Sequence, residues 1–291
     1  MLKKTFKWVG IVLACIFSLL IIAYAYIYLS TEARFNKKYS FREDPVTLST
    51  DTAVLTRGAH LVAIKACDDC HGPDLAGKVF IDDPLLGRIV SSNLTSGKGG
   101  RPSDYGVVDW LKALRHAVNK EGKPLFFMPS HEIVQLSKAD IVAILSYLQT
   151  IPPVDSDLPT HDIRFLGRIL THFDKVPLLP VDMIDHNMGW PKEVEENVSA
   201  AFGKYLVAVC TGCHRENLKG GGPIAPGLPP VADITATGRV GQMTEDQFMN
   251  TLRTGVTPEG RSLNPKEMPW PTTSKYTDTE LKAIYAYLKS I

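Results

Sequence analysis

Four of the five cysteines lie in two copies of a short pattern, in which two cysteines three positions apart are followed at once by a histidine. The copies are Cys67-Asp68-Asp69-Cys70-His71 and Cys210-Thr211-Gly212-Cys213-His214. On one side of a helical turn, both thiols can add to the vinyl groups of one haem while the histidine binds its iron. The pattern therefore predicts two covalently bound haems c, one at each motif.

Two other interpretations of the cysteine pairs have less support. A zinc site needs further Cys or His ligands at compatible spacing, and the only histidine after residue 198 is His214. A redox-active cysteine pair normally lies where a strand meets a helix in an α/β fold, and the sequence around the motifs lacks that context. The fifth cysteine, Cys15, lies in an apolar N-terminal stretch, so none is left for a disulfide framework.

A methionine followed by proline occurs at matching positions after the two motifs, at Met128 and Met268. The residue before a proline is extended, which favours a loop from which a thioether can approach iron opposite the histidine. A methionine is more often a core residue, but the repetition before each final helix favours a ligand role. We therefore predict His71 and Met128 as one pair of iron ligands, and His214 and Met268 as the other. Such iron is coordinatively saturated and suits electron exchange.

The motifs belong to an internal repeat, which indicates a duplicated domain. The matching segments are Gly58-Ala59-His60-Leu61 with Gly203-Lys204-Tyr205-Leu206, Ser92-Asn93-Leu94-Thr95 with Ala232-Asp233-Ile234-Thr235, and Ala143-Ile144 with Ala283-Ile284. Ser137 and Thr277 each stand three residues before an acidic residue and an apolar stripe of helical period, which predicts a capped final helix in each copy. No sustained strand alternation is present, so the sequence predicts an all-α fold.

Composition and the segment between the copies complete this organisation. The hydrophobic fraction of 44% and the charged fraction of 22% are ordinary for globular proteins, and a net charge of +1 does not favour nucleic acid as a partner. The sequence predicts an anchor at residues 1–30, a first domain at 50–151, a connector at 152–197 and a second domain at 198–291. The connector is rich in proline, and its apolar residues favour packing on the domains.

The N-terminal stretch from Trp8 to Leu29 carries no charge and is preceded by three lysines. About 20 apolar residues cross the hydrocarbon core of a bilayer, and lysines before the span stay on the cytoplasmic side. A cleaved signal peptide usually has a shorter apolar region and a small-residue cleavage site. A lipoprotein cleavage box before Cys15 is the other alternative, although the following residues remain apolar. We expect an uncleaved anchor.

The chain resembles class I cytochromes c, and in particular the cytochrome c subunits of bacterial membrane-bound alcohol and aldehyde dehydrogenases. The resemblance covers both domains and rests on the run from Gly58 into Cys67, on residues 92–95, on residues 114–125 and on Met128-Pro129. It implies two class I cytochrome c domains in tandem after an N-terminal transmembrane helix. Those subunits usually carry three haem motifs, whereas this chain has two.

The class I resemblance also suggests residues around the haem. It implies that a proline carbonyl accepts a hydrogen bond from each haem histidine, and Pro84 and Pro226 are the candidates by position, with an ordinary turn proline as the alternative. Arg115 and Arg253 repeat between the copies and are candidates to neutralise haem propionates. A solvated helix face is the alternative for both arginines.

We therefore expect a dihaem electron carrier of a bacterial respiratory chain, without catalysis of its own. The expected partners are a donor dehydrogenase or quinol-oxidising complex, and an acceptor oxidase or soluble cytochrome. The expected location is the bacterial inner membrane, with the haem domains on the periplasmic side. A dihaem enzyme of the peroxidase or sulfur-compound dehydrogenase type, with one open haem, is the alternative, and a redox sensor is a third hypothesis.

Overall fold

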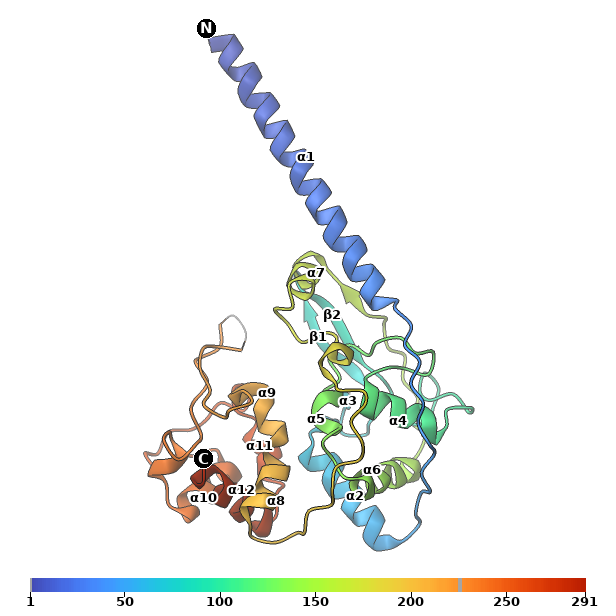
Figure 1. Ribbon diagram of the computed structural model, residues 1–291, viewed down its shortest axis with the longest axis vertical. Coiled ribbons are helices and arrows are strands. Elements are labelled where there is room, and N and C mark those ends of the chain that lie inside the picture. The colour runs from blue at the N-terminus through green and yellow to red at the C-terminus, as the bar shows by residue number, and fades with distance from the viewer. Residues whose placement is uncertain (1, 225–226) are drawn as a thin grey trace.

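The computed structural model describes residues 2–224 and 227–291, in which a long N-terminal helix, α1 (Leu2–Phe35), projects from two helical units (Figure 1). The first unit contains α2 (Thr52–Ile64), α3 (Cys67–His71), α4 (Val107–His116), α5 (Ser130–Ile133) and α6 (Lys138–Thr150). The second unit contains α8 (Ala200–Leu206), η2 (Val207–Cys210), α9 (Thr211–His214), η3 (Val240–Gln242), α10 (Glu245–Thr254), α11 (Trp270–Thr273) and α12 (Asp278–Lys289).

Helix α1 leaves the globular part as a single apolar rod. Among the described residues it is the one helix long and apolar enough to cross a membrane, and its most apolar window has a mean hydropathy of 2.5 with no residue buried. Only its C-terminal end is covered, where Thr31 and Phe35 are buried. A helix of this kind near the N-terminus fits a membrane anchor or a signal sequence.

Each unit is built on a crossing of the helix that precedes its motif with its last helix, α2 with α6 and α8 with α12. Gly58 and Gly203 allow the close approach, because a Cβ at either position would collide with the carbonyl oxygen of Ala143 or Ala283, respectively. The last helices begin as the sequence predicts. The side chain of Ser137 accepts a hydrogen bond from the N–H of Asp140 in α6, and Thr277 caps α12 in the same way, each at 3.2 Å.

The fold is mostly helical, but the expectation of an all-α fold is corrected by a small antiparallel sheet with strand order β1-β2-β3. Strands β1 (Lys78–Asp83) and β2 (Gly87–Ser91) form a hairpin, with Val79 opposite Val90. Strand β3 (Asp162–Ile163) comes from the connector and pairs with Gly87 and Arg88. The apolar residues of β1 and β2 are adjacent, as in Val79-Phe80-Ile81 and Ile89-Val90, and therefore show no period of two in the sequence.

The connector packs on the first unit, as its apolar residues indicate. It contains β3, the helix α7 (Phe165–His172) and η1 (Pro180–Met183). Leu178, Leu179 and Val181 are buried and share a small core with Val118 of the first unit and Phe35 of α1. The connector therefore ties the end of α1 to the first unit.

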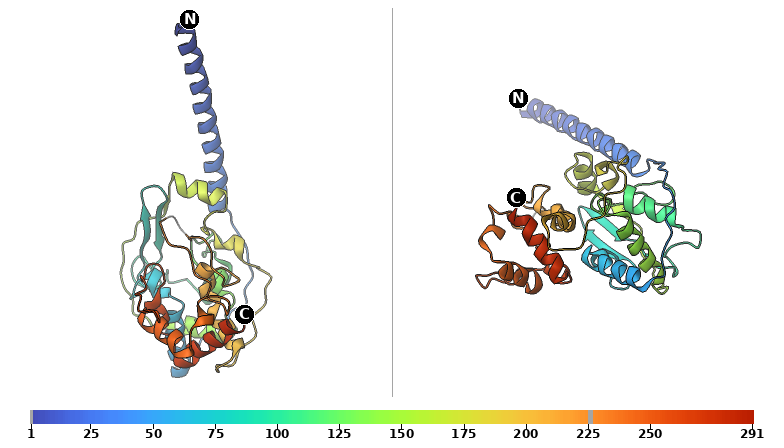
Figure 2. Two further views of the ribbon diagram at one scale, coloured as in Figure 1. Left: turned by 90° about the vertical axis from the view of Figure 1, so that its left-hand side faces the viewer. Right: turned by 60° about the horizontal axis from the view of Figure 1, so that its bottom comes forward.

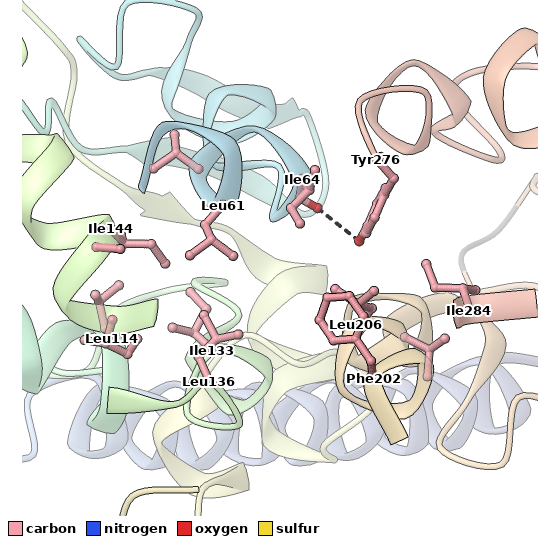
Figure 3. Close-up of a cluster of buried hydrophobic side chains, with 14 of the residues drawn as sticks. Leu61, Ile64, Leu114, Ile133, Leu136, Ile144, Phe202, Leu206, Tyr276 and Ile284 are labelled. Carbon is pink, nitrogen blue, oxygen red and sulfur yellow. Dashed lines mark hydrogen bonds between the residues drawn. The ribbon is translucent and has the colours of Figure 1, made fainter. Parts of the chain in front are cut away.

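The main core runs without interruption from one unit into the other (Figure 3). Leu61 and Ile64 of α2 lie on one side of the junction and Phe202 and Leu206 of α8 on the other, and all four side chains are buried. The hydroxyl of Tyr276 donates to the carbonyl oxygen of Ile64 at 3.4 Å. The two units are thus joined by a continuous apolar interface.

Candidate functional site

The first motif forms the short helix α3, which begins directly after Ala66, a residue in the left-handed region at φ 58°. This bend lets the chain turn from α2 into α3, so that Cys67 and Cys70 remain partly exposed while His71 is buried. Nδ1 of His71 lies 2.7 Å from the carbonyl oxygen of Ser92 and must donate to it. Nε2 therefore keeps its lone pair, which is the arrangement of a metal-ligating histidine.

The second motif repeats this geometry. Nδ1 of His214 donates to the carbonyl oxygen of Ala232 at 2.8 Å. Burial lowers the pKa of both His71 and His214, although each hydrogen bond to a carbonyl opposes the shift. Both imidazoles are therefore neutral near pH 7, with Nε2 available as a ligand.

The two accepting carbonyls lie at the start of the matching segments 92–95 and 232–235. The side chains of Asn93 and Asp233 accept from the N–H of Thr95 and Thr235, respectively, each at 2.8 Å, which fixes both segments as the same Asx turn. The carbonyls that orient the histidines are thus positioned by residues that repeat in the sequence.

The prediction that proline carbonyls accept from the histidines is wrong for Pro84. Its carbonyl lies in the β1–β2 turn and accepts from Arg164 at 3.4 Å. The hairpin carries Pro84 away from His71, and the chain returns only after β2, at Ser92. Pro226 lies outside the described residues, and Ala232 takes the corresponding role beside His214.

All four residues predicted for the first haem, Cys67, Cys70, His71 and Met128, line one cavity of about 340 Å³. Its walls are mainly apolar and include Phe80, Ile89, Val90, Leu94, Leu114, Leu125, Phe126, Phe127, Ile133, Ile144 and Leu148. This size lies within the range of small-molecule and cofactor sites, which is about 300–1,000 Å³. The histidine and the methionine are therefore gathered around one apolar space.

The cavity also has a polar edge. Nε1 of Trp110 is buried there and has no hydrogen-bond partner among the described residues, and Arg101 lies over the Trp110 ring at 5.2 Å from its centroid. A buried donor without an acceptor is unfavourable unless a ligand supplies one. A haem, with an apolar body and two carboxylates at one edge, matches the apolar walls and this donor.

The two arginines proposed for the propionates are engaged elsewhere. Arg115 donates to Glu43 at 2.8 Å and stacks on Trp190 at 3.9 Å, and Arg253 pairs with Asp278. The arginine that lines the cavity is Arg101, which the sequence analysis missed. The signal was available, because a Gly-Arg step follows the matching segments in both copies, at residues 100–101 and 238–239.

Met268 lies on the same type of turn as Met128. Its carbonyl accepts from the N–H two residues later at 2.7 Å, as the carbonyl of Met128 does, and the following prolines have φ/ψ of −76°/60° and −77°/49°. The second set, Cys210, Cys213, His214 and Met268, thus repeats the local geometry of the first. Met268 is assigned to the same site as His214 because its backbone turn is equivalent to that of Met128.

The thiols do not have the character of a redox-active pair. Burial raises the pKa of both Cys67 and Cys210 to about 12, whereas reactive thiols of this kind have lowered pKa values. Cys67 also follows the helix α2 rather than a strand.

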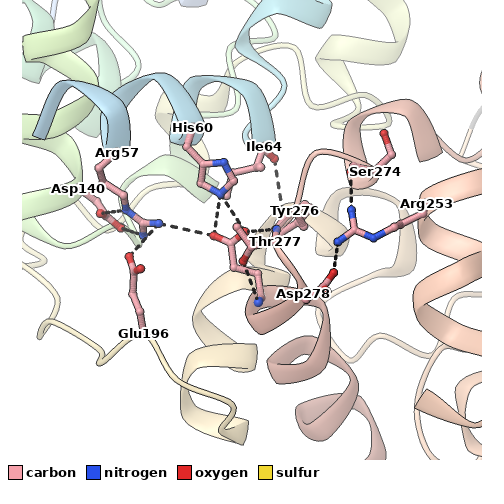
Figure 4. Close-up of polar contacts among 11 residues, drawn as sticks. Arg57, His60, Ile64, Asp140, Glu196, Arg253, Ser274, Tyr276, Thr277 and Asp278 are labelled. Carbon is pink, nitrogen blue, oxygen red and sulfur yellow. Dashed lines mark hydrogen bonds and ion pairs between the residues drawn. The ribbon is translucent and has the colours of Figure 1, made fainter. Parts of the chain in front are cut away.

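Equivalent residues of the two units contact each other reciprocally. His60 of α2 binds Glu280 of α12, with Nε2 2.8 Å from Oε2, and Arg57 lies beside this pair (Figure 4). The matching residue of α8, Tyr205, donates to Asp140 of α6 at 2.6 Å. Since His60 corresponds to Tyr205 and Asp140 to Glu280 in the repeat, the two contacts are related by an approximate two-fold axis.

A second reciprocal pair lies at the motifs themselves. Thr272, which follows Met268, donates to Asp69 of the first motif at 2.5 Å. Reciprocally, Glu132, which follows Met128, lies against Gly212 of the second motif. Its Oε1 is 2.8 Å from the position that a Cβ on Gly212 would occupy. Each motif helix therefore faces the turn that follows the methionine of the other unit.

Comparison with known proteins matches the cytochrome c family to residues 200–291. The fructose dehydrogenase cytochrome subunit of Gluconobacter japonicus is 25% identical over 278 residues, which is 85% of this chain and 54% of that protein. The cytochrome c subunit of alcohol dehydrogenase (quinone) from Gluconobacter oxydans is 26% identical over 275 residues, 83% of this chain and 55% of that protein. The chain thus spans about half the length of these relatives. A "Diheme cytochrome c-type" protein of Cereibacter sphaeroides is 23% identical over 273 residues and matches over 86% of this chain and 90% of its own length.

Proposed function

We propose that this protein, a cytochrome c family protein that resembles the cytochrome c subunits of membrane-bound dehydrogenases, is a membrane-anchored dihaem electron carrier. Its two haems c would be held by Cys67, Cys70, His71 and Met128 and by Cys210, Cys213, His214 and Met268. The observation that carries the proposal is the duplicated histidine geometry, with Nδ1 fixed on a carbonyl and Nε2 free in both units.

A haem ligated by His and Met supplies a one-electron couple without an open coordination position. The chain contributes the ligands and their orientation, because the Asx turns hold the carbonyls that position His71 and His214. The apolar walls of the first cavity exclude water, and Trp110 offers a donor to a carboxylate. The reciprocal contacts hold the motif helices α3 and α9 at a common interface, which favours electron exchange between the two sites.

The domain boundaries follow from the same reasoning. We assign class I cytochrome c domains to residues 50–151 and 198–291, a connector to 152–197 and a membrane anchor to 1–30. The end of α1 supports an anchor that is retained, because Arg34 donates to the carbonyl oxygen of Thr171 at 2.9 Å and Phe35 is buried in the connector core. Removal of α1 as a signal sequence would expose this core.

The lysines in the first turns of α1 favour a cytoplasmic N-terminus, and therefore haem domains on the periplasmic side of the inner membrane. The partners that fit this position are a donor dehydrogenase or a quinol-oxidising complex, and an acceptor oxidase or soluble cytochrome. The relatives from Gluconobacter support a role as the cytochrome subunit of a quinone-linked dehydrogenase complex. In that role the chain transfers electrons and carries out no catalysis of its own.

The test is ferric near-infrared absorption of the full-length protein, scaled to covalent haem content. The iron–methionine charge-transfer band should correspond to two equivalents, and Met128→Ala and Met268→Ala should each remove one. Met183→Ala, at an exposed methionine of the connector, is the control and should remove none. A band of one equivalent or none would contradict a purely electron-carrying role and favour a dihaem enzyme or a sensor.

A further inference from the structure

The contacts of α7 with α1 determine how deep α7 would lie relative to a membrane that α1 spans. The uncharged stretch of α1 ends at Leu29, and a span of about 20 residues places that end near the outer boundary of the hydrocarbon core. Tyr24 lies five residues before Leu29, about 7.5 Å deeper at 1.5 Å per residue. The ring of Phe165, at the start of α7, packs on Tyr24 with a centroid distance of 4.7 Å. His172, at the end of α7, packs edge-on against Tyr26 at 5.6 Å.

Both ends of α7 therefore lie at the level of the last turns of the apolar stretch. Figure 2 shows α7 lying crosswise at the base of α1, on the side of the globular part from which α1 leaves. A helix at this depth and in this orientation lies in the plane of the interface between lipid headgroups and acyl chains.

Polar contacts fix α7 in this position. Arg168 pairs with Glu32 and donates to Thr31, each at 3.0 Å. From the other side, Arg34 donates to the carbonyl oxygen of Thr171 and pairs with Asp174 at 2.9 Å. These contacts hold α7 against α1, so the side chains that α7 presents to its surroundings are set by the fold.

Those side chains are large and apolar. Phe165 and Phe173 are 55% and 57% exposed, and Leu85, in the β1–β2 turn, is 61% exposed. The turn adjoins α7, because the N–H of Leu166 donates to the carbonyl oxygen of Leu85 at 3.1 Å. We call these three side chains the α7 surface. Leu85 adjoins the first end of α7 and Phe173 lies at its other end, and exposed apolar side chains along a helix beside a membrane span favour a contact with lipid.

The charges beside the α7 surface suit a lipid headgroup region. Arg164 and Lys175 flank the two ends of α7 and are exposed. Asp162 pairs with Arg164 at 3.0 Å, and Asp174 is paired with Arg34. Lysine and arginine beside an apolar face are typical of helices that lie in the membrane interface.

We propose that the α7 surface is a second membrane contact, which inserts Leu85, Phe165 and Phe173 among the lipids beside α1. The inference rests on the proposed function in one respect, namely that α1 is a retained membrane span. It fixes the first unit against the bilayer, so that its haem site is the one nearer the membrane.

The experiment uses the full-length, haem-loaded protein in nanodiscs of phosphatidylethanolamine and phosphatidylglycerol. A nitroxide label is attached at Phe165→Cys, Phe173→Cys or the control Val198→Cys, each in a Cys15→Ser background. Val198 is 54% exposed and lies in the segment before α8. Power-saturation electron paramagnetic resonance then compares label collisions with oxygen, which concentrates in lipid, and with a water-soluble nickel chelate.

We expect oxygen collisions to dominate at 165 and 173 and nickel collisions to dominate at 198, with a several-fold difference in their ratio. Equal ratios at all three positions would overturn the proposal. A label on the natural Cys15 of the unsubstituted chain separates the two ideas. If that label reports lipid while 165 and 173 report water, only the α7 surface is refuted; if Cys15 also reports water, the anchor is refuted and this inference with it.

Discussion

Replacing Glu132 with glutamine should stabilise the protein in a pH-dependent manner. The Glu132 side chain is 16% exposed and lies against Gly212 of the second motif. Burial raises the pKa of this carboxyl from its ordinary value of 4.5 to about 7, although Lys65 opposes the shift. Below pH 4.5 the carboxyl is protonated in both the folded and the unfolded chain, so folding carries no penalty. As the pH rises, the unfolded chain ionises first and the folded state loses stability.

The size of the effect follows from the pKa difference. At 1.36 kcal/mol per pKa unit, a pKa of about 7 in the fold against 4.5 in the unfolded chain corresponds to about 3 kcal/mol above pH 7. Glu132→Gln keeps the shape and removes the charge. It should therefore raise the free energy of unfolding by about 3 kcal/mol at pH 8 and leave it nearly unchanged at pH 4.

The assay is guanidinium chloride unfolding of the haem-loaded protein at both pH values, followed by far-ultraviolet circular dichroism. Glu121→Gln, at an exposed glutamate of the same unit, is the matched control and should change stability at neither pH. The reasoning is refuted if Glu132→Gln destabilises the protein at pH 8. That result would mean that the ionised carboxylate is stabilised in the fold, with Lys65 as its partner.

Three further substitutions test the packing and the site, each by guanidinium chloride unfolding of the haem-loaded protein. Gly203→Ala should destabilise the protein by about 1–3 kcal/mol, because its Cβ would clash at the α8–α12 crossing. Gly222→Ala is the control and should be neutral, because a Cβ there would have no other atom within 4 Å. Equal effects would contradict the packing argument. Tyr205→Phe should lose about 1.5–3 kcal/mol, because its hydroxyl donates to the carboxylate of Asp140; no loss would remove this contact from the interface. Trp110→Phe should lose a similar amount if its Nε1 donates to a haem carboxylate, and a neutral or stabilising result would show that the donor has no acceptor there.

The sequence was sufficient to predict the chemistry-bearing segments, because each is short and local. The spacing within Cys67 to His71 places those side chains on one turn, and the proline after Met128 selects an extended methionine on a loop. Capping by Ser137 and Thr277 is also local, and both helices begin where the pattern indicates. Repetition in the second copy strengthened each of these predictions.

The features that the sequence could not predict depend on contacts between distant segments. Strand β3 pairs with β2 across more than seventy positions; β3 is only two residues long, and the apolar residues of β2 do not alternate. The surroundings of Arg115 could not be predicted, because its partners Glu43 and Trp190 are distant in sequence. The same holds for the carbonyl of Ser92: its segment was visible as a repeat, but the hairpin that brings it to His71 was not.

The reciprocal contacts explain why equivalent positions of the two copies differ. In a symmetric homodimer one substitution changes both copies of a contact, whereas in a duplicated chain each copy can vary alone. Here one contact joins Tyr205 to Asp140, and its counterpart joins His60 to Glu280. Burial alone would raise the pKa of Glu280, but the hydrogen bond to His60 and the N–H of Thr277 hold it below its ordinary value.

The stability that Glu280 contributes is therefore present above the pKa of an unfolded glutamate and is lost as the pH falls through its lowered pKa in the fold. On the other side, burial raises the pKa of Tyr205, so its hydroxyl remains a donor throughout the neutral range. Tyr205 also accepts a hydrogen bond from the N–H of Ser137 at 2.9 Å, which couples this contact to the cap of α6. The duplicated interface thus keeps one geometry on both sides while pairing its carboxylates with different chemistry, an imidazole on one side and a phenol on the other.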